Sequence, residues 1–475
     1  NDNTQWAEPE FIPLDPPENG IQLHLEPFEV WTNNEREIFY YTPLDTTDEL
    51  FISQNQPYSG IRGIWLLATP SLIFVSYTVF ISIPSIYIIS TVNHPQALNY
   101  YLSILSFYLL FPVGLYYGNK IFPIQNTQVE KMYNMEWTLE MDHKLIYEIL
   151  IIMLSIIILI LCLYLIRVDT IPVFEIIRDP KVYKILFMLR EESMKLLNVP
   201  RIEKYFYSWS RDLLIPLGIV SSLFLYIIDK KRKYFLLFLI YFSVGIFNNS
   251  ITVAKLPIAA IFFSLMAMYL LRKRHFSFRM IIASLISIFS IPVMINYIAS
   301  LPHLRTPEKL LYAIAYRLFV VPAEVLFEYF KIFPDKHPFL LGRSTQLFSW
   351  IHSDGNFNTA NYVAQVWWKD RFTTGSANAV YIGNFWADFG LFGVMTVTLI
   401  LGILIHYIYK QILATSHYKM DLIYVTFTTA FISHFTFSFV SSSITVIAIT
   451  KGMIFIPLLL YFYRQLQKKI KNVPF

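Results

Sequence analysis

Charged residues and cysteine are scarce in this sequence. Asp, Glu, Lys and Arg make up 15% of the 475 residues, whereas hydrophobic residues make up 55% and the mean hydropathy is +0.47. Soluble globular chains contain about 25% charged residues, so the composition excludes an ordinary soluble fold and indicates a membrane protein. The single cysteine, Cys162, excludes an intrachain disulfide and a metal site built from cysteines.

Short motifs that mark common enzyme classes are missing as well. The sequence contains no GxxxxGK[ST], HExxH, GxSxG or CxxC pattern, which argues against an ATP-driven pump, a zinc protease and a serine hydrolase. The chain begins with Asn1 and has no signal-peptide pattern there, as expected of a trimmed or processed terminus. The formal net charge is +5, an excess that a membrane protein carries in cytoplasmic loops, so we expect no nucleic-acid partner.

Long hydrophobic runs are what the sequence has instead. A transmembrane helix needs about 20 apolar residues to cross a hydrocarbon core of about 30 Å. We predict an all-α polytopic membrane protein with about ten transmembrane helices. The predicted spans are residues 64–89, 98–117, 145–166, 213–228, 235–247, 256–271, 280–299, 391–409, 422–439 and 443–463.

Basic clusters between the predicted spans set the orientation. They all fall on one side of the ten-helix arrangement, which the positive-inside rule assigns to the cytoplasm. Both termini then face the cytoplasm, and two long loops, 167–212 and 301–390, face the opposite side. The clusters lie at 229–233, 272–275, Lys410, Lys419 and 464–471.

This arrangement divides the chain into four parts. Residues 1–60 are acidic and polar and are expected to form an irregular tail. Residues 61–300 contain the first seven helices together with loop 167–212. Residues 301–390 form a large outer loop with amphipathic helices, and residues 391–475 contain the last three helices and a basic tail.

Loop 167–212 contains nine Arg or Lys residues on the side where few are expected. These residues either pair with acids of the same loop or bind an anionic ligand. Arg190 and Arg211 are the candidates for ligand binding, because Arg211 lies at the mouth of the fourth span, where a guanidinium could hold a phosphate through two hydrogen bonds. Lys255, at the outer end of the sixth span, either extends to the interface or pairs with a lipid-linked phosphate.

The large loop carries both cations and carboxylates. In a continuous helix Arg317, Glu324 and Glu328 would share nearly one face, although Pro322 would kink that helix or start a new one. A shared face predicts either a structural row of ion pairs or a site. In such a site the arginine contacts an anionic leaving group and a carboxylate takes the proton from a hydroxyl. Arg343 is the next cation along the loop.

Aromatic residues crowd the end of the large loop. An interfacial aromatic belt explains many of them, and platforms that stack on sugar rings would explain the others. Trp386 is the candidate for such a platform. The group comprises Tyr362, Trp367, Trp368, Phe372, Tyr381, Phe385 and Trp386.

Taken together, two stretches of the large loop resemble the oligosaccharide repeat-unit polymerases of bacterial surface polysaccharide assembly, the O-antigen polymerase type. The stretches are YRLFVVPAEVLFEYFKIFPDKHPFLLG at 316–342 and AVYIGNFWADFGLFG at 379–393. The segments MLREESMKLL at 188–197 and TVAKLPIAAIFF at 252–263 are similar to that family as well.

The resemblance implies a C-type glycosyltransferase fold in the bacterial inner membrane, with its active site on the periplasmic side. Such enzymes transfer a growing glycan from undecaprenyl diphosphate to the non-reducing end of a new lipid-linked repeat unit, without metal, nucleotide sugar or other cofactor. Metal-binding transferases of polyprenyl-phosphate sugars commonly have acids in the first outer loop, and residues 90–96 (STVNHPQ) have none. The implied partners are the lipid-linked oligosaccharides, the bilayer, a chain-length regulator and a flippase.

The needs of this reaction match the candidate residues identified above and suggest a role for each. Glu324 or Glu328 is expected to be the base, with Arg317 assisting the leaving diphosphate. The remaining residues are expected to bind diphosphate or glycan, namely Arg190, Arg211, Lys255, Arg343, Tyr316 and Trp386.

Two alternatives stay open. A ligase that passes finished glycan to another acceptor shares this architecture and usually has a histidine in the large loop, so His337 or His352 would have to be indispensable. A transporter or flippase for lipid-linked oligosaccharide would instead need charged residues along a passage through the spans.

Overall fold

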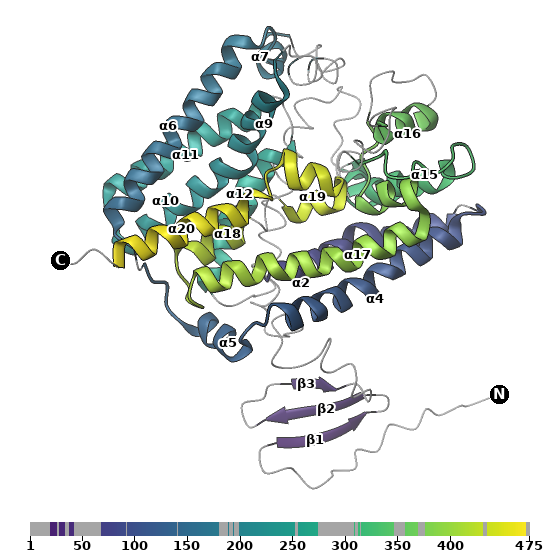
Figure 1. Cartoon of the computed structure of the whole chain (residues 1–475), viewed down its shortest axis with the longest axis horizontal. Coiled ribbons are helices and arrows are strands. Elements are labelled where there is room, and N and C mark those ends of the chain that lie inside the picture. The colour runs from purple at the N-terminus through teal and green to yellow at the C-terminus, as the bar shows by residue number, and fades with distance from the viewer. Residues whose placement is uncertain are drawn as a thin grey trace.

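The structure is a computed structural model of the chain, and its largest part is a body of packed helices (Figure 1). It describes residues 20–25, 28–33, 38–41, 68–91, 93–139, 141–179, 189, 193, 199–251, 255–273, 308, 312–313, 315–345, 357–368, 376–430 and 435–471.

Six helices of the described residues are long and apolar enough to cross a membrane, so the prediction of an α-helical membrane protein is confirmed at that level. They match six of the ten predicted spans. The six are Thr69–Ile88, Ala97–Ile121, His143–Arg167, Ile202–Asp229, Tyr381–Thr415 and Val446–Gln465.

The other four predicted spans are not among these six candidates. Helices α11 (Arg232–Ser250) and α12 (Lys255–Lys273) form where the fifth and sixth spans were predicted, but they are not among the six candidates. The seventh, 280–299, lies outside the described residues. In the ninth, 422–439, the structure has helices α18 (Leu422–Ala430) and α19 (Thr436–Ser441), and residues 431–434 between them lie outside the described residues.

The remaining elements of the body follow in chain order. Several long helices consist of consecutive α-helical segments joined by a π-helical turn, which is labelled η. The first part comprises α2 (Thr69–Tyr77), η3 (Thr78–Ser82), α3 (Ile83–Thr91), α4 (Ala97–Ile121), α5 (Asn126–Asn134), α6 (His143–Arg167), α7 (Pro172–Arg178), α9 (Arg201–Trp209), η5 (Ser210–Leu214) and α10 (Ile215–Asp229). The second part comprises η7 (Tyr316–Val320), α15 (Val321–Ile332), α16 (Thr359–Trp368), α17 (Tyr381–Thr415), η10 (Val446–Thr450) and α20 (Phe455–Lys471).

The amino-terminal segment, expected to form an acidic tail over residues 1–60, contains three strands. Strands β1 (Gly20–Leu25), β2 (Phe28–Asn33) and β3 (Ile38–Tyr41) form an antiparallel sheet in the order β1-β2-β3. The segment IQLHL alternates apolar and polar residues, the period of a strand with one covered face. The acidic composition hid this alternation.

Glycines allow α4 and α17 to approach closely, and this pair forms the longest helix contact of the body. A Cβ on Gly402 would lie 2.4 Å from the Phe111 carbonyl oxygen and 2.8 Å from the Gly114 Cα. Small residues at a crossing let two backbones pack without intervening side chains, as in membrane helix pairs. The core built around this contact is rich in fully buried tyrosine and phenylalanine.

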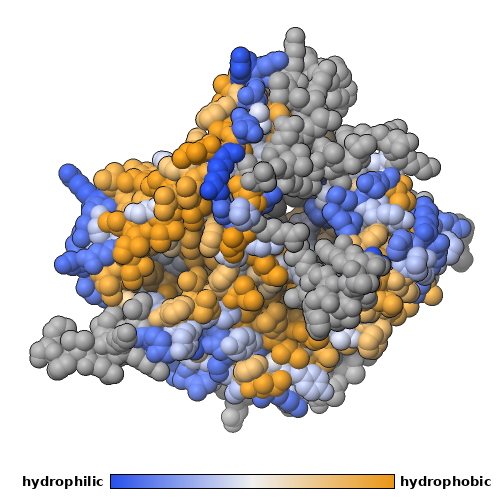
Figure 2. All heavy atoms as spheres, turned by 45° about the horizontal axis from the view of Figure 1, so that its top comes forward, coloured by the Kyte–Doolittle hydropathy of each residue, from blue (hydrophilic) through white to orange (hydrophobic). Residues whose placement is uncertain are grey.

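The two ends of the body differ in character. At one end, which we call the basic end, His143 at the start of α6 bonds to Asp229 at the end of α10, with 2.6 Å between Nδ1 and Oδ2. At the other, the loop end, Arg167 pairs with Glu203 and the Val173 amide donates to the Ile251 carbonyl. Figure 2 shows hydrophobic residues over much of one face, with hydrophilic residues gathered toward its margins.

Helix α17 starts earlier than predicted, at Tyr381 instead of residue 391. The first turns are separated from the rest by a kink at Gly390, where φ is +61° and ψ is −151°. A residue with a Cβ rarely adopts this backbone conformation. The large loop is therefore shorter than predicted, because its last residues already belong to the kinked helix.

Candidate functional site

The π turns pack in two pairs, and the predicted polar residues divide between these pairs. Turn η7 packs against η3, where the Phe319 and Phe80 rings stack with centroids 5.4 Å apart. Turn η5 lies beside η10, because the Trp209 indole nitrogen donates to the Ile449 carbonyl at 2.6 Å. π turns in natural proteins frequently mark functional sites. We therefore describe the two regions as the η3–η7 site and the η5–η10 site.

The η3–η7 site is centred on Glu324. Pro322 begins α15 directly after the π turn, as its missing N–H allows at a helix start. The wider π turn changes which residues share a face, so Tyr316 reaches Glu324, with 2.9 Å from the phenol oxygen to Oε2. The Glu324 side chain is half-buried and Arg317 is exposed.

The predicted row of ion pairs does not form along this face. Among the described residues, no ion pair links Arg317 to either glutamate. Glu328 is buried and pairs instead with Lys331, with 2.6 Å between Oε1 and Nζ. The structure therefore brings Tyr316 and Glu324 together and engages Glu328 with Lys331.

Burial and the Glu324 carboxylate raise the pKa of Tyr316 to about 12. The phenol therefore remains a neutral hydrogen-bond donor to Glu324 at physiological pH. Exposed tyrosines surround this donor. Tyr312 stacks on Tyr316 with ring centroids 5.9 Å apart, and Tyr87 on α3 is close enough to act on Tyr316 electrostatically. The site thus combines a carboxylate, exposed aromatic rings and the exposed cation Arg317.

Buried contacts hold α15 in place beneath this site. The Tyr100 hydroxyl on α4 bonds to the Ala323 carbonyl at 3.0 Å and to Ser85 on α3 at 2.6 Å. At the far end of α15, Trp386 donates from its indole nitrogen to the Phe333 carbonyl at 2.9 Å. These bonds tie α15 to both α4 and α17, so Glu324 lies on a rigid element.

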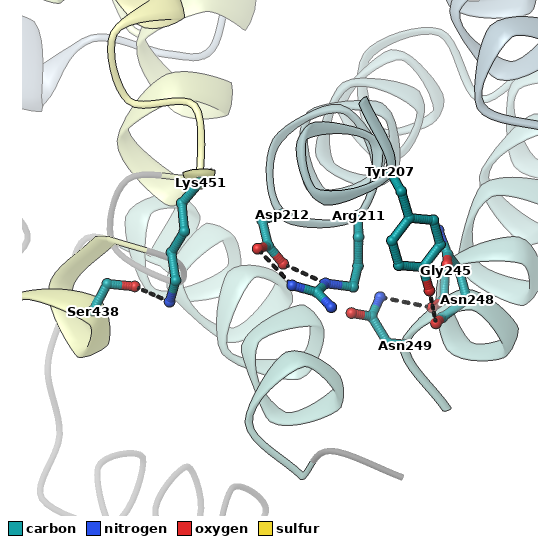
Figure 3. A network of polar contacts seen from close by, with 8 residues as sticks. All are labelled: Tyr207, Arg211, Asp212, Gly245, Asn248, Asn249, Ser438 and Lys451. Carbon is teal, nitrogen blue, oxygen red and sulfur yellow. Dashed lines mark hydrogen bonds and ion pairs between the residues drawn. The ribbon is translucent and has the colours of Figure 1, made fainter. Parts of the chain in front are cut away.

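The η5–η10 site is centred on Arg211 (Figure 3). Its guanidinium bonds bidentately to the adjacent Asp212, with Nε···Oδ1 2.7 Å and Nη2···Oδ2 2.9 Å. Lys451, on the turn after η10, interacts electrostatically with both residues and donates to the Ser438 hydroxyl at 2.6 Å. Arg211 lies inside the helix that begins at Arg201, so its predicted place at the mouth of a span is corrected.

Several buried polar atoms of this site have no hydrogen-bond partner among the described residues. They are Asn249 Oδ1, both side-chain polar atoms of Asn248, and Ser210 Oγ. Figure 3 shows the Asn249 side-chain oxygen turned toward the Arg211 guanidinium, while its Nδ2 donates to the Gly245 carbonyl at 2.8 Å. A buried polar group without a partner costs about 1–3 kcal/mol, so such groups often face a ligand or water.

The other predicted site residues lie apart from these clusters. Trp386 is buried with its ring stacked on Phe330 at 4.2 Å, a core position that offers no free face to a sugar. Arg343 follows Gly342 in a turn whose Ser344 donates to the buried Asp388.

The structure describes the remaining predicted residues only in part. Lys255 is the first residue of α12, and its side chain lies outside the described atoms. Arg190 and His352 also lie outside the described residues. His337 is described, and its Nδ1 donates to the Pro338 carbonyl at 2.7 Å.

Sequence reasoning missed Lys451, Asp212, Asn248 and Asn249. For Lys451 a signal was present, because it is a single lysine inside the hydrophobic run predicted at 443–463. An ionisable residue within a span marks a functional site by default. The asparagines gave no comparable signal, since polar residues at a helix end are ordinary.

Among the described residues no group of three or more His, Cys, Asp and Glu side chains is arranged to hold a metal ion. No protein-family model, curated protein or solved structure matches this chain.

Proposed function

We propose that this chain is a membrane glycosyltransferase that polymerises undecaprenyl-diphosphate-linked repeat units into surface polysaccharide. The observation that carries the proposal is the Tyr316–Glu324 pair, a half-buried carboxylate on α15 beside exposed aromatic rings and a cation. Glycosyl transfer to a hydroxyl needs these three elements. The resemblance of residues 316–342 and 379–393 to O-antigen polymerases supports the same activity.

In this proposal Glu324 is the general base. Its free carboxylate oxygen takes the proton of the acceptor hydroxyl as that oxygen bonds to the anomeric carbon of the growing glycan. The bond from that carbon to the lipid diphosphate breaks, and the diphosphate leaves with the electron pair. Tyr316 positions Glu324 by donating to its other oxygen.

Cations assist the departure of the diphosphate. Arg317 is exposed beside the base and is our candidate for contact with the leaving group. Arg190, Arg211, Lys255 and Arg343 are proposed to bind the lipid-linked substrates. Loss of one preorganised contact of this kind lowers kcat by about a hundredfold or more. The periplasmic location of the site follows from the positive-inside orientation and belongs to the proposal.

One observation favours a second candidate function. Arg211 and Asp212 lie within one candidate span and Lys451 within another, and charges inside spans are typical of a transport pathway. A flippase for lipid-linked oligosaccharide would use such charges to carry an anionic headgroup. A ligase with His337 as an essential residue is the remaining alternative.

Surface glycan from a strain that lacks its own copy tests these alternatives. Arg317, Arg211 and Arg190 are replaced singly by Ala, with Arg167→Ala as the matched control, because Arg167 is a loop-end arginine whose ion pair with Glu203 is exposed. Polymerase loss leaves single-repeat glycan without a long ladder on a gel. A full ladder in all three variants, with protein present in the membrane, would overturn the assignment of these arginines.

The strain without any copy separates the enzyme from its alternatives. Single-repeat glycan should persist there if the chain is a polymerase. Complete loss of surface glycan favours the flippase or ligase, and loss of activity in His337→Ala alone favours the ligase.

A further inference from the structure

The surroundings of Arg211 point to a phosphate-binding site, an inference that rests on the proposed function, in which Arg211 binds the lipid-linked substrates. Arg211, Asp212 and Lys451 come from segments about 240 positions apart, and they meet among the hydrophobic residues of two candidate spans. The cluster lies between η5, the end of α11 and the turn that follows η10, with Asp212 buried and Arg211 and Lys451 partly buried.

The charges of this cluster do not cancel. Arg211 and Lys451 each carry a positive charge, and Asp212 carries the negative charge that both of them face. Within the described part of the chain, one positive charge is therefore left over in a region of low dielectric. A charge in such a place is expensive unless a partner of opposite sign accompanies it.

The hydrogen-bond donors are also in excess. A guanidinium has five N–H donors, and Arg211 uses two of them on Asp212. An ammonium has three, and Lys451 uses one on Ser438 among the described residues. The unpartnered acceptor that faces Arg211 is Asn249 Oδ1. A ligand that offers several acceptor oxygens and one negative charge would satisfy what remains.

We propose that this cluster binds one phosphate group of a lipid headgroup. Phosphate oxygens accept several charge-assisted hydrogen bonds at once, which suits a neighbouring arginine and lysine. The Nε and Nη2 atoms of Arg211 already donate to Asp212, so Arg211 contributes its remaining Nη hydrogens to the phosphate. Lys451 is then the principal charge partner of the phosphate. The site lies toward the loop end of its spans, where a headgroup would meet it.

Lipid binding to the full-length protein in detergent tests the proposal by native mass spectrometry. The probes are undecaprenyl phosphate, undecaprenol as the matched lipid without phosphate, phosphatidylglycerol and inorganic phosphate. Lys451→Met should weaken binding of undecaprenyl phosphate by about tenfold or more, since a hydrogen bond to a charged group is lost. Lys451→Arg should retain it, and Lys410→Met, a lysine at the basic end, serves as the control.

Asp212→Asn should change the affinity for undecaprenyl phosphate in the opposite direction. It removes the one carboxylate of the cluster with little change of shape, so phosphate binding should become tighter. A variant that is merely misfolded would not bind more tightly. The thermal midpoints of all variants are recorded to show that each is folded.

The probes distinguish the source of the phosphate. Binding of undecaprenyl phosphate alone identifies a polyprenyl headgroup, equal binding of phosphatidylglycerol identifies a general phospholipid, and displacement by inorganic phosphate shows recognition without the lipid tail. Each of these supports the site. Unchanged binding in folded Lys451→Met, or equal binding of undecaprenol, overturns it. Glycan polymerisation is read separately from the surface ladder, so a failure of this binding site can be distinguished from a failure of the proposed function.

Discussion

Glu328 and Lys331 form an ion pair one turn apart on α15, with 2.6 Å between Oε1 and Nζ. This contact distinguishes the two carboxylates that the sequence left equivalent. Glu328 is buried and engaged by a cation, whereas Glu324 is half-buried and accepts a bond from a neutral phenol. A base must reach the acceptor hydroxyl, so Glu324 is the better candidate.

Replacement of the two glutamates should therefore have different effects. Glu324→Gln should lower polymerisation by about 10²- to 10⁴-fold, the usual contribution of a general base, with little change in thermal stability. The measurement is ladder length on a gel together with the amount of protein in the membrane. A full ladder in Glu324→Gln would exclude this residue as the base.

Glu328→Gln should affect stability instead of activity. It leaves Lys331 without its carboxylate in a mostly buried position, which costs about 1–3 kcal/mol. The thermal midpoint of the purified protein should fall, and the double replacement of Glu328 and Lys331 by Met should recover part of the loss, because no unpaired charge then remains. No recovery in the double variant would show that the pair is not the cause.

The raised pKa of Tyr316 predicts a pH dependence of stability. Its folded value of about 12 exceeds the ordinary value near 10, because burial and Glu324 disfavour the phenolate. The stability that this hydroxyl contributes is therefore complete below about pH 10 and is lost as the pH rises through about 12. The difference in thermal midpoint between wild type and Tyr316→Phe should be constant to about pH 10 and shrink above it. A difference that does not change with pH would contradict the contact.

The α4–α17 crossing should not tolerate a methyl group. Gly402→Ala would place a Cβ 2.4 Å from the Phe111 carbonyl oxygen, and backbone atoms cannot move aside as a flexible side chain can. Overpacking of this kind costs about 1–3 kcal/mol. Ser155→Ala, an exposed position on α6, is the control for the thermal measurement. Equal midpoints for the two variants would disprove the close contact.

The sequence predicted the features that depend on local composition. Runs of apolar residues identified six spans, because membrane thickness sets the length of a crossing helix. It could not predict that Arg211 engages the adjacent Asp212, since both side chains could equally have faced solvent. Lys451 joins them only because the fold brings two distant turns together.

The π turn after Ala315 changed the predicted site most. A regular helix would have placed Arg317 in line with Glu324, whereas the wider turn directs Tyr316 to Glu324 and leaves Arg317 exposed. Hydrophobic periodicity does not reveal a single π turn, because it adds one residue without a change of composition. The amino-terminal strands were missed for a related reason, since their alternation is brief and lies in an acidic segment.

Reconstitution in lipid vesicles tests the proposed activity most directly. Purified protein is supplied with undecaprenyl-diphosphate-linked repeat units in the presence of EDTA and without nucleotide sugar, and the products are sized by mass spectrometry. The wild type and Arg167→Ala should form glycans longer than one repeat, with release of undecaprenyl diphosphate, and Glu324→Gln should not. If the repeat units cross the bilayer without becoming longer, the chain is a transporter and the proposal is wrong.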